Sequence, residues 1–344
     1  MYTKIYSPKQ VKLAATKIRE GEVIAFPTET VYGVGADATN PQAVKKVFAV
    51  KHRPRNNPLN VTVNGISMVK KYTQTISGKS LKLMRKFWPG PLTIILRLKP
   101  GTLSSVINGG RTTLAFRNPD TPVTLKMIDE AGVPIVGPSG NISGRPSPTR
   151  PEHVLHDLNG RIAGVISAGA CPIGIDSTVI DMTRRIPLVL RPGTVTIQQL
   201  TKIIGRVQDI TKLHPSVAVK NSPSAKLRHY STSDPVYIVK PNEWPLVAKW
   251  TKNREFRTGI MATDDVLRRV HFPSTVNPYR LGPGIKTADR RFFDGLRYFD
   301  SIPTVKYILV QAFPNRGASE AYMDRLNGSS NKMEFKRDLY QNGD

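Results

Sequence analysis

The sequence predicts an α/β protein made of a mixed, twisted-sheet domain followed by a smaller α/β domain. Short apolar runs typical of strands recur along the first 205 residues, and helical patterns lie between several of them. After residue 232 such runs resume in a second, shorter set. With 344 residues, 39% hydrophobic and 22% charged, the chain has enough apolar content for two packed cores.

The first elements have clear start and stop signals. Ser-Pro at 7–8 begins a helix that Gly21 ends, and Asn-Pro at 40–41 begins another that ends at Lys51. A strand is expected between them, at Val23–Phe26. The later strand-like runs are Leu59–Val63, Thr93–Leu98, Thr113–Arg117, Pro134–Val136, Val165–Ser167, Thr178–Asp181 and Leu188–Arg191.

A change in pattern marks the boundary between the domains. A short helix at Ile197–Ile203 closes the first domain, and residues 206–232 then lose periodicity and gain Pro, Ser and Lys. We therefore predict a first domain at 1–205, a linker or lid at 206–232 and a second domain at 233–344. The second domain is expected to be a small three-layer unit, with strands at Val236–Val239, Thr258–Ala262 and Tyr307–Val310 and one helical face made by Ala288, Phe292, Leu296 and Phe299.

The chain is strongly basic, with 51 Lys and Arg against 25 Asp and Glu, a net charge of +26 and a pI near 10.3. Such an excess attracts polyanions, nucleotides and anionic lipids alike, so it indicates the sign of a ligand but not its class. The two predicted domains are both basic. A solvated basic surface and a nucleic-acid groove are therefore alternative interpretations.

Several function classes are disfavoured. The sequence has no GxxxxGK[ST], GxGxxG, HExxH or GxSxG motif, and its six histidines are scattered. The single cysteine, Cys171, rules out an internal disulfide and a Cys-rich zinc site, as expected in a reducing compartment. Because there is no apolar run of about 18 residues and no signal-peptide pattern at the N-terminus, we expect a cytoplasmic protein without a membrane segment.

Polar loops follow many of the predicted strands. Each loop alone is explained by turn chemistry, and the three cations of KHRPRNNPL by a solvated face. Together they place hydroxyls, amides and guanidinium groups at strand ends, which could surround a triphosphate and a small zwitterion. The loops are PTETVYGVG (27–35), KHRPRNNPL (51–59), FRNP (116–119), PSGNISG (138–144), DSTV (176–179) and RPGT (191–194).

These loops and WPGPLT (88–93), in this order and spacing, resemble the YrdC/Sua5 family of threonylcarbamoyl-AMP synthases. The family's hallmark is a Lys-x-Arg pair with a Ser-x-Asn pair, here Lys51/Arg53 and Ser139/Asn141. The match is dense over residues 7–205. SPSAKLRHYS (222–231) resembles the family's inter-domain motif, and Asp324-Arg325-Leu326 is similar to the end of a Sua5-type second domain. The resemblance implies a YrdC-like mixed twisted-sheet catalytic domain and a smaller, Rossmann-like Sua5 domain.

The resemblance implies an enzyme, a nucleotidyltransferase. It would join L-threonine, bicarbonate or CO2, and ATP into L-threonylcarbamoyladenylate and pyrophosphate, for t6A37 modification of ANN-decoding tRNAs. Mg²⁺ would accompany ATP, bound by phosphates and water rather than by protein ligands. The t6A transferase machinery would accept the intermediate, and direct tRNA binding stays open. Two alternatives are a basic RNA-binding module without synthase activity and a carbamoyl-adenylate transferase like a domain of the hydrogenase maturation proteins, whose zinc-finger and acylphosphatase-like parts are missing here.

The resemblance also implies residue roles. Lys51 and Arg53 would be catalytic, neutralising carboxylate, carbamate and phosphates, and Arg117 would bind the threonine carboxylate with a bidentate fork. Tyr230 would cover the nucleotide. The implied ATP-binding residues are Lys51, Arg53, Asn57, Thr113, Ser139, Asn141, Ser147, Arg191 and Tyr230. The implied threonine-binding residues are Thr30, Thr62, Arg117 and Ser177.

Some positions depart from the family pattern. Thr62 stands where many relatives carry a histidine, so a hydroxyl replaces a group that could be charged. In the linker, Ser224-Ala225 replaces Gly-Met and removes a glycine that would permit a positive φ. In the second domain, Gln311 and the segment 316–318 stand where relatives often have Glu and Gly-Leu-Gly.

Overall fold

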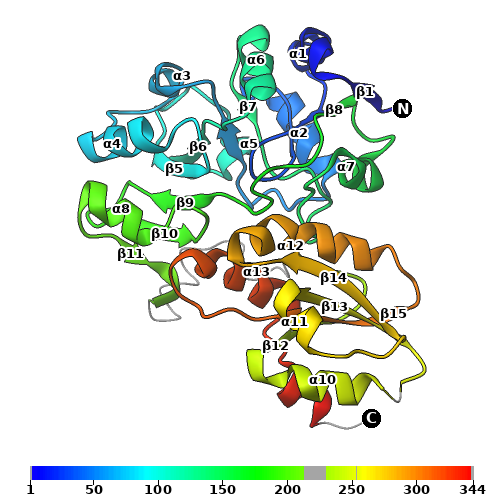
Figure 1. Ribbon diagram of the computed structural model, residues 1–344. Coiled ribbons are helices and arrows are strands. Elements are labelled where there is room, and N and C mark those ends of the chain that lie inside the picture. Colours follow the sequence, from blue (N-terminus) through cyan, green and yellow to red (C-terminus); the bar gives the residue numbers. More distant parts are fainter. Residues whose placement is uncertain (1, 213–229, 253, 342–344) are drawn as a thin grey trace. The chain divides into compact units, whose positions relative to one another are not determined.

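The computed structural model describes residues 2–212, 230–252 and 254–341, and the chain divides into two compact units (Figure 1). The first unit takes Met1–Ser143, Ser147–Pro172 and Asp176–Lys226, and the second takes Gly144–Pro146, Ile173–Ile175 and Leu227–Asp344. Residues 208–212, which the sequence assigned to the linker, form a strand and a 3-10 turn of the first unit. Residues 213–229 of the predicted linker lie outside the described residues. No helix in the described part of the chain is long and apolar enough to cross a membrane.

The first unit contains short strands and helices that alternate along the chain. Its strands are β1 (Lys4–Tyr6), β2 (Ile24–Phe26), β3 (Gly33–Gly35), β4 (Asn60–Thr62), β5 (Leu92–Arg97), β6 (Thr113–Arg117), β7 (Ile135–Val136), β8 (Gly164–Ile166), β9 (Thr178–Asp181), β10 (Leu188–Arg191) and β11 (Gln208–Asp209). Its helices are α1 (Val11–Arg19), α2 (Pro41–Val50), α3 (Ile66–Tyr72), α4 (Gly78–Phe87), α5 (Ser105–Asn108), α6 (Pro122–Ala131), α7 (Pro151–Leu158) and α8 (Ile197–Ile204). The predicted strands are confirmed to within one or two residues.

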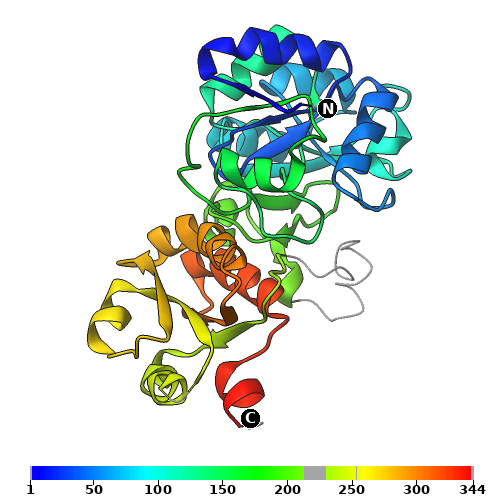
Figure 2. The same cartoon turned by 90° about the vertical axis from the view of Figure 1, so that its right-hand side faces the viewer.

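The strands form two sheets rather than one. A four-stranded sheet has the order β1-β8-β2-β3, and a seven-stranded mixed sheet has the order β11-β10-β9-β5-β6-β4-β7. Helix α1 packs along α6, and both views of the ribbon show them together (Figures 1 and 2). The start of α2 follows the sequence signal, because the Asn40 side chain accepts hydrogen bonds from the backbone N–H of Gln42 and Ala43 while Pro41 takes the first helical position.

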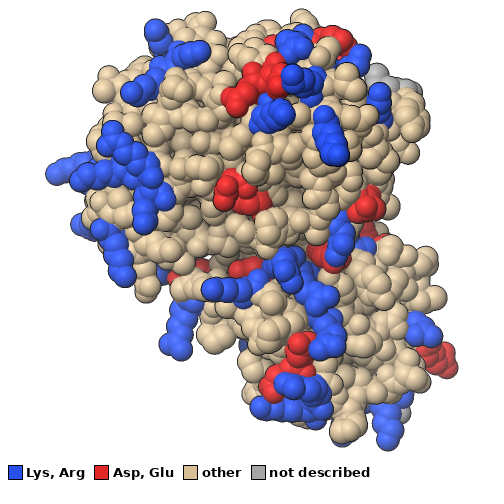
Figure 3. Space-filling view, turned by 45° about the horizontal axis from the view of Figure 1, so that its top comes forward, with Lys and Arg blue, Asp and Glu red and all other residues tan. Residues whose placement is uncertain are grey.

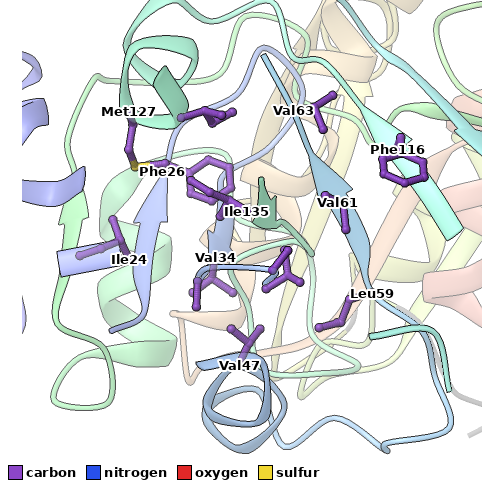
Figure 4. Packing of buried hydrophobic residues seen from close by; sticks show 14 of the residues in the cluster. Ile24, Phe26, Val34, Val47, Leu59, Val61, Val63, Phe116, Met127 and Ile135 are labelled. Carbon is purple, nitrogen blue, oxygen red and sulfur yellow. The ribbon is translucent and has the colours of Figure 1, made fainter. Parts of the chain in front are cut away.

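One hydrophobic core lies inside the first unit. Figure 4 shows residues of β2, β3, β4 and β7 packing against each other and against α2 and α6. Ile24, Val34, Val61 and Ile135 are fully buried. Since these strands are apolar on the core side, polar side chains at their ends and on the opposite face of the large sheet are left to build a site.

The second unit is a doubly covered parallel sheet. Its strands are β12 (Val236–Val239), β13 (Arg257–Thr263), β14 (Val276–Gly282) and β15 (Val305–Gln311), and its helices are α10 (Trp244–Thr251), α11 (Asp264–Arg269), α12 (Ile285–Asp300) and α13 (Glu320–Ser330). The order is β12-β15-β13-β14 and all described pairs are parallel. This arrangement confirms the predicted Rossmann-like class.

Alternation along β13 places helices on both faces of this sheet. Ile260 and Ala262 pack with Trp244 and Trp250 of α10, whereas Gly259 lies directly under the Phe299 ring of α12. The predicted helical face is confirmed, because its four residues are all fully buried. Strand β14 was not predicted, because Pro278 interrupts it and alternate residues of this edge strand are exposed.

Candidate active site

A cavity of about 470 Å³ lies on the polar face of the seven-stranded sheet. The strand register builds its floor: Arg117 of β6 lies opposite Thr93 of β5, Thr93 opposite Val179 of β9, and Val179 opposite Arg191 of β10. All four residues line the cavity. Directly opposed residues of neighbouring strands share a face of the sheet. Arg117 and Arg191, which come from the two strands that flank β5 and β9, therefore lie on the same face and point into the same cavity.

The loop after β2 forms one end of the cavity. The Thr28 hydroxyl lies 2.9 Å from the Thr30 hydroxyl and 2.6 Å from the Val31 carbonyl oxygen, which fixes a tight turn. Thr28 lines the cavity, whereas Thr30 is fully buried behind it. Between them in the chain, Glu29 Oε1 lies 2.8 Å from Arg117 Nη2, and both side chains are less than a tenth exposed. Arg117, the predicted carboxylate ligand, is therefore already held by a buried carboxylate.

Hydroxyls and a second arginine meet beside this end. Ser177 Oγ lies 2.8 Å from Thr93 Oγ1, and Arg191 donates to both Ser177 Oγ, at 3.3 Å, and the Ser177 carbonyl oxygen, at 3.1 Å. The network holds Ser177, a predicted threonine ligand, on the cavity floor. Donors and acceptors of this kind suit a small zwitterion with a hydroxyl group.

Two arginines that line the cavity, Arg53 and Arg191, interact through their charges. Arg53 donates from Nε and Nη2 to the Asn57 carbonyl and side-chain oxygens, and from Nη2 to the Pro58 carbonyl oxygen, all at 2.8–3.1 Å. All of these acceptors are neutral. Burial, and next the positive charge of Arg191, lower the pKa of Arg53 to about 10. Two partly buried cations that repel each other are unfavourable for the folded chain alone. Such an arrangement is expected where an anionic ligand supplies the compensating charge.

Lys51 supports the cavity from behind. Its ammonium group donates to the backbone carbonyl oxygens of Ser139 and Asn141, and the side chain is only 1% exposed. Lys51 therefore fixes the PSGN loop, from which Ser139 reaches the cavity wall. The residue just before this loop has to be glycine, since a Cβ at Gly137 would come within 2.1 Å of Thr62 Oγ1.

The structure brings most of the predicted site residues together. Those that line the cavity are Arg53, Asn57, Thr113, Arg117, Ser139, Ser177 and Arg191. Those buried around it without lining it are Thr30, Lys51, Thr62, Asn141 and Ser147. Tyr230 belongs to the second unit, where its ring lies 4.9 Å from that of Phe293 and its φ is +61°.

Sequence reasoning missed several polar residues of the cavity. Asp176 lines it and accepts a hydrogen bond of 3.3 Å from the Ser147 hydroxyl. At the other end Asp181 accepts from Arg184 Nε at 2.8 Å, and both of these residues line the cavity together with Arg111. Alternation was the available signal for Asp181, which follows Val179 of β9, and Ser177 just before that strand, at a spacing of two.

Comparisons with known proteins show the family to which the chain belongs. The Sua5/YciO/YrdC family, described as "Telomere recombination", matches residues 16–193, and the "Threonylcarbamoyl-AMP synthase, C-terminal domain" family matches residues 195–330. The chain belongs to the Sua5/YrdC family. A threonylcarbamoyl-AMP synthase of Bacillus subtilis is 40% identical and that of Pyrococcus abyssi 36%, with more than nine-tenths of each chain covered.

A solved structure supports the same assignment for both units. The structure of P. abyssi Sua5 complexed with L-threonine has a TM-score of 0.87 and 32% identity, and the match covers 96% of this chain and 99% of that one. The YciO structure of Escherichia coli, at 21% identity and a TM-score of 0.53 over 58% of this chain, shares the fold of the first unit. As a Sua5 family member the chain therefore has both parts of the two-domain form.

Two departures from the family pattern have a visible environment. Thr62 is 3% exposed, and its hydroxyl lies against Gly137. Thr62 is not among the described residues that line the cavity. Gln311, at the end of β15, accepts a hydrogen bond of 2.7 Å from the backbone N–H of Thr263 and so ties two neighbouring strands of the second unit together. Another departure, Ser224-Ala225, lies outside the described residues.

Proposed function

We propose that this chain is an L-threonylcarbamoyladenylate synthase that acts in t6A37 modification of ANN-decoding tRNAs. It would convert L-threonine, bicarbonate or CO2, and ATP into L-threonylcarbamoyladenylate and pyrophosphate. The observation that carries the proposal is the composition of the cavity: five arginines and two aspartates line it, with hydroxyls gathered at one end. An anionic nucleotide and a small hydroxy amino acid together match that distribution of charge and hydrogen-bonding groups.

The chemistry needs positioning and charge neutralisation more than a protein nucleophile. The threonine amine adds to CO2 and loses a proton to give a carbamate; a carbamate oxygen then bonds to the α-phosphorus while the bond from that phosphorus to the pyrophosphate oxygen breaks. Arg53 and Arg191 are placed to stabilise the negative charge that builds up on the phosphates. Cys171 is no candidate nucleophile, because it is buried and burial raises the pKa of its thiol to about 12.

Threonine would bind at the end formed by Thr28, Arg117 and Ser177. Arg117 would pair with the carboxylate, with Glu29 holding the guanidinium in place from behind. Because both anions must approach each other, holding them on one rigid sheet face supplies much of the rate enhancement. Asn57 and Thr113, which also line the cavity, would contact the nucleotide, and Tyr230 would cover it.

Mg²⁺ would enter with ATP. Within the described residues, no three His, Cys, Asp or Glu side chains are grouped so that they could hold a metal ion. The ion would therefore be bound by phosphate oxygens and water, as Mg²⁺ commonly is. The product would pass to the t6A transferase machinery, and the chain would work in the cytoplasm, where its single thiol stays reduced.

The decisive assay follows pyrophosphate release from ATP, Mg²⁺ and bicarbonate with and without L-threonine. Release that requires threonine is expected, together with a threonylcarbamoyl adduct of AMP detected by mass spectrometry. Serine, which lacks the methyl group, serves as the comparison amino acid. A folded protein that releases no pyrophosphate in response to threonine would overturn the proposal.

A further inference from the structure

The positive charge of this chain is concentrated in one segment. Residues 38–119 contain 15 Lys and Arg and no Asp or Glu. Three of these cations, Arg53, Arg111 and Arg117, line the cavity, and Lys51 is buried behind it. Most of the others lie on a different surface of the first unit, and the proposed synthase reaction does not use them.

We name this surface the α3–α4 surface and define it by eight exposed cations. Two lie on the last turn of α3, four on α4, and two at the end of β5 and just beyond it. They are Lys70, Lys71, Lys79, Lys82, Arg85, Lys86, Arg97 and Lys99. Figure 3 shows the cluster of Lys and Arg side chains over α3 and α4.

Backbone hydrogen bonds join two of these elements, α3 and β5. Gln74 N donates to the Arg97 carbonyl oxygen at 3.0 Å, and Lys99 N donates to the Tyr72 carbonyl oxygen at 2.9 Å, so the end of α3 is bonded to the end of β5. An open groove runs between α3, α4 and this strand end, with polar Thr73, Gln74 and Thr75 in its wall and a lysine, Lys70 or Lys99, on each flank.

Stability of the fold does not explain this charge. Lys79, Lys82 and Lys86 follow each other at spacings of three and four residues on α4, where like charges repel by some tenths of a kcal/mol per pair. Lys79 also lies in the first turn of α4, where the helix dipole disfavours a cation and where no acidic residue occurs. In the part of the chain that the structure describes, none of the eight cations has an ion-pair partner.

We propose that the α3–α4 surface docks the phosphate backbone of RNA, and specifically of a tRNA. The three α4 lysines span about 10 Å along the helix axis, and a nucleic acid duplex presents enough phosphates over that length to meet all of them. The choice of tRNA among nucleic acids rests on the proposed function. Binding there would bring the tRNA that awaits modification to the enzyme that makes the labile threonylcarbamoyl donor.

The surface lacks the features that other polyanionic partners need. A membrane-binding face carries exposed apolar anchors, and a protein interface carries an apolar or aromatic centre. The large exposed hydrophobic residues in the described part of the chain are Tyr2, Ile5, Leu13 and Tyr298, and none of them lies on the α3–α4 surface. Nucleic-acid interfaces, by contrast, are polar and strongly positive.

The test compares two variants with the same change in net charge. The first replaces three α4 lysines: K79Q, K82Q and K86Q. The matched control replaces three lysines near and on α1, a helix whose lysines lie beside acidic residues: K9Q, K12Q and K17Q. Lys12 lies 3.8 Å from Glu130 and Lys17 lies 2.6 Å from Glu20.

Binding of a tRNA transcript is measured by fluorescence anisotropy over a range of salt concentrations. We expect the α4 variant to bind at least tenfold more weakly at 150 mM salt, with the slope of log K against log[salt] reduced by about 2, because each phosphate contact contributes about 0.7 to 0.9 to that slope. The α1 control should keep its affinity within about twofold of the unmodified protein.

The inference fails if the α4 variant binds tRNA like the unmodified protein, or if the α1 control loses as much affinity. It also fails if the α4 lysines matter only for anionic vesicles or for polyglutamate, which would make this a membrane or protein surface. Threonine-dependent pyrophosphate release is measured on the same samples without tRNA. That activity decides the proposed function separately, since none of the substituted lysines lines the cavity.

Discussion

A double-mutant cycle on the buried pair of Glu29 and Arg117 can separate the contribution of this pair to stability from its contribution to substrate binding. The two side chains lie 2.8 Å apart and are 6% and 9% exposed. Removing one partner leaves an uncompensated charge in the interior, so R117A and E29Q should each lower the free energy of unfolding of the first unit by about 3–5 kcal/mol. The double variant R117A/E29Q removes both charges and should be more stable than the sum of the two losses predicts, by about 2–3 kcal/mol.

Threonine binding should respond differently. A hydrogen bond to a charged group contributes about 1.5–3 kcal/mol, which corresponds to a 10- to 100-fold change in affinity. R117A and the double variant should therefore both show a threonine KM raised by about 10- to 100-fold, whereas the KM for ATP changes little. E29Q keeps the guanidinium and should keep threonine binding better than either.

Two assays complete the cycle. Urea unfolding monitored by circular dichroism gives the stabilities, and pyrophosphate release at saturating ATP gives the threonine KM. Strictly additive stability losses would refute the coupling between Glu29 and Arg117. A folded double variant with an unchanged threonine KM would refute the role of Arg117 as the carboxylate ligand.

Three further predictions follow from buried contacts. K51A should reduce threonine-dependent pyrophosphate release by more than 100-fold, because the PSGN loop loses two charge-assisted hydrogen bonds. The rate of release at saturating substrate concentrations measures this effect. A folded K51A protein with a normal rate would contradict the prediction. G137A should lower stability by about 1–3 kcal/mol, since its Cβ would meet Thr62 Oγ1, and T62A added to it should restore part of the loss; chemical denaturation measures both. Burial raises the pKa of Asp289 to about 7, so the folded second unit holds this proton more tightly than the unfolded chain does, and the Asp289 contribution to stability falls as pH rises from about 4 to about 7. D289N should remove this pH dependence and stabilise the second unit at pH 8 by up to about 4 kcal/mol relative to its effect at pH 4; a difference between the two proteins that is independent of pH would contradict the shift.

Local motifs made part of the site predictable from sequence. Arg53 and Asn57 lie four residues apart in one turn, and their hydrogen bonds are formed within that turn. Ser139 lies in a glycine-rich loop whose composition already indicated an unusual backbone. The geometry of such residues is set by contacts within a short segment of the chain, so a sequence motif can identify them.

Contacts between distant strands were beyond the sequence. Thr93 and Ser177 are bonded across 84 positions, because β5 and β9 are parallel neighbours in the sheet. The sequence of an apolar strand does not show whether the hydroxyl of a threonine in it faces a cavity, because the face depends on the register of that strand with its neighbours. The pairing of Arg117 with Glu29 is hidden for the same reason.

Because both predicted domains carry a net positive charge, counting charges by domain did not reveal that residues 38–119 contain no Asp or Glu. Counting over 205 residues averages residues 38–119 with the acidic residues that surround them in the chain. The structure gives this segment a physical meaning, because β5 and β6, which line the cavity floor beside β9, and Asn60 of β4 all belong to it. A carboxylate there would act as an internal anion and compete with a carbamate or a phosphate for the arginines.

The carboxylates that do occur at the cavity come from outside the segment and are engaged by other groups. Asp176 accepts a hydrogen bond from Ser147, and Asp181 accepts one from Arg184. Arg53 donates its hydrogen bonds to neutral oxygens of Asn57 and Pro58 and, within the described residues, to no carboxylate, so burial and next the repulsion from Arg191 lower its pKa. An anion bound between the two guanidinium groups would offset that repulsion. The positive charge that is costly to the folded chain is thus the source of its affinity for a triphosphate, and nucleotide binding should raise the stability of the first unit in proportion to RT ln(1 + [L]/Kd).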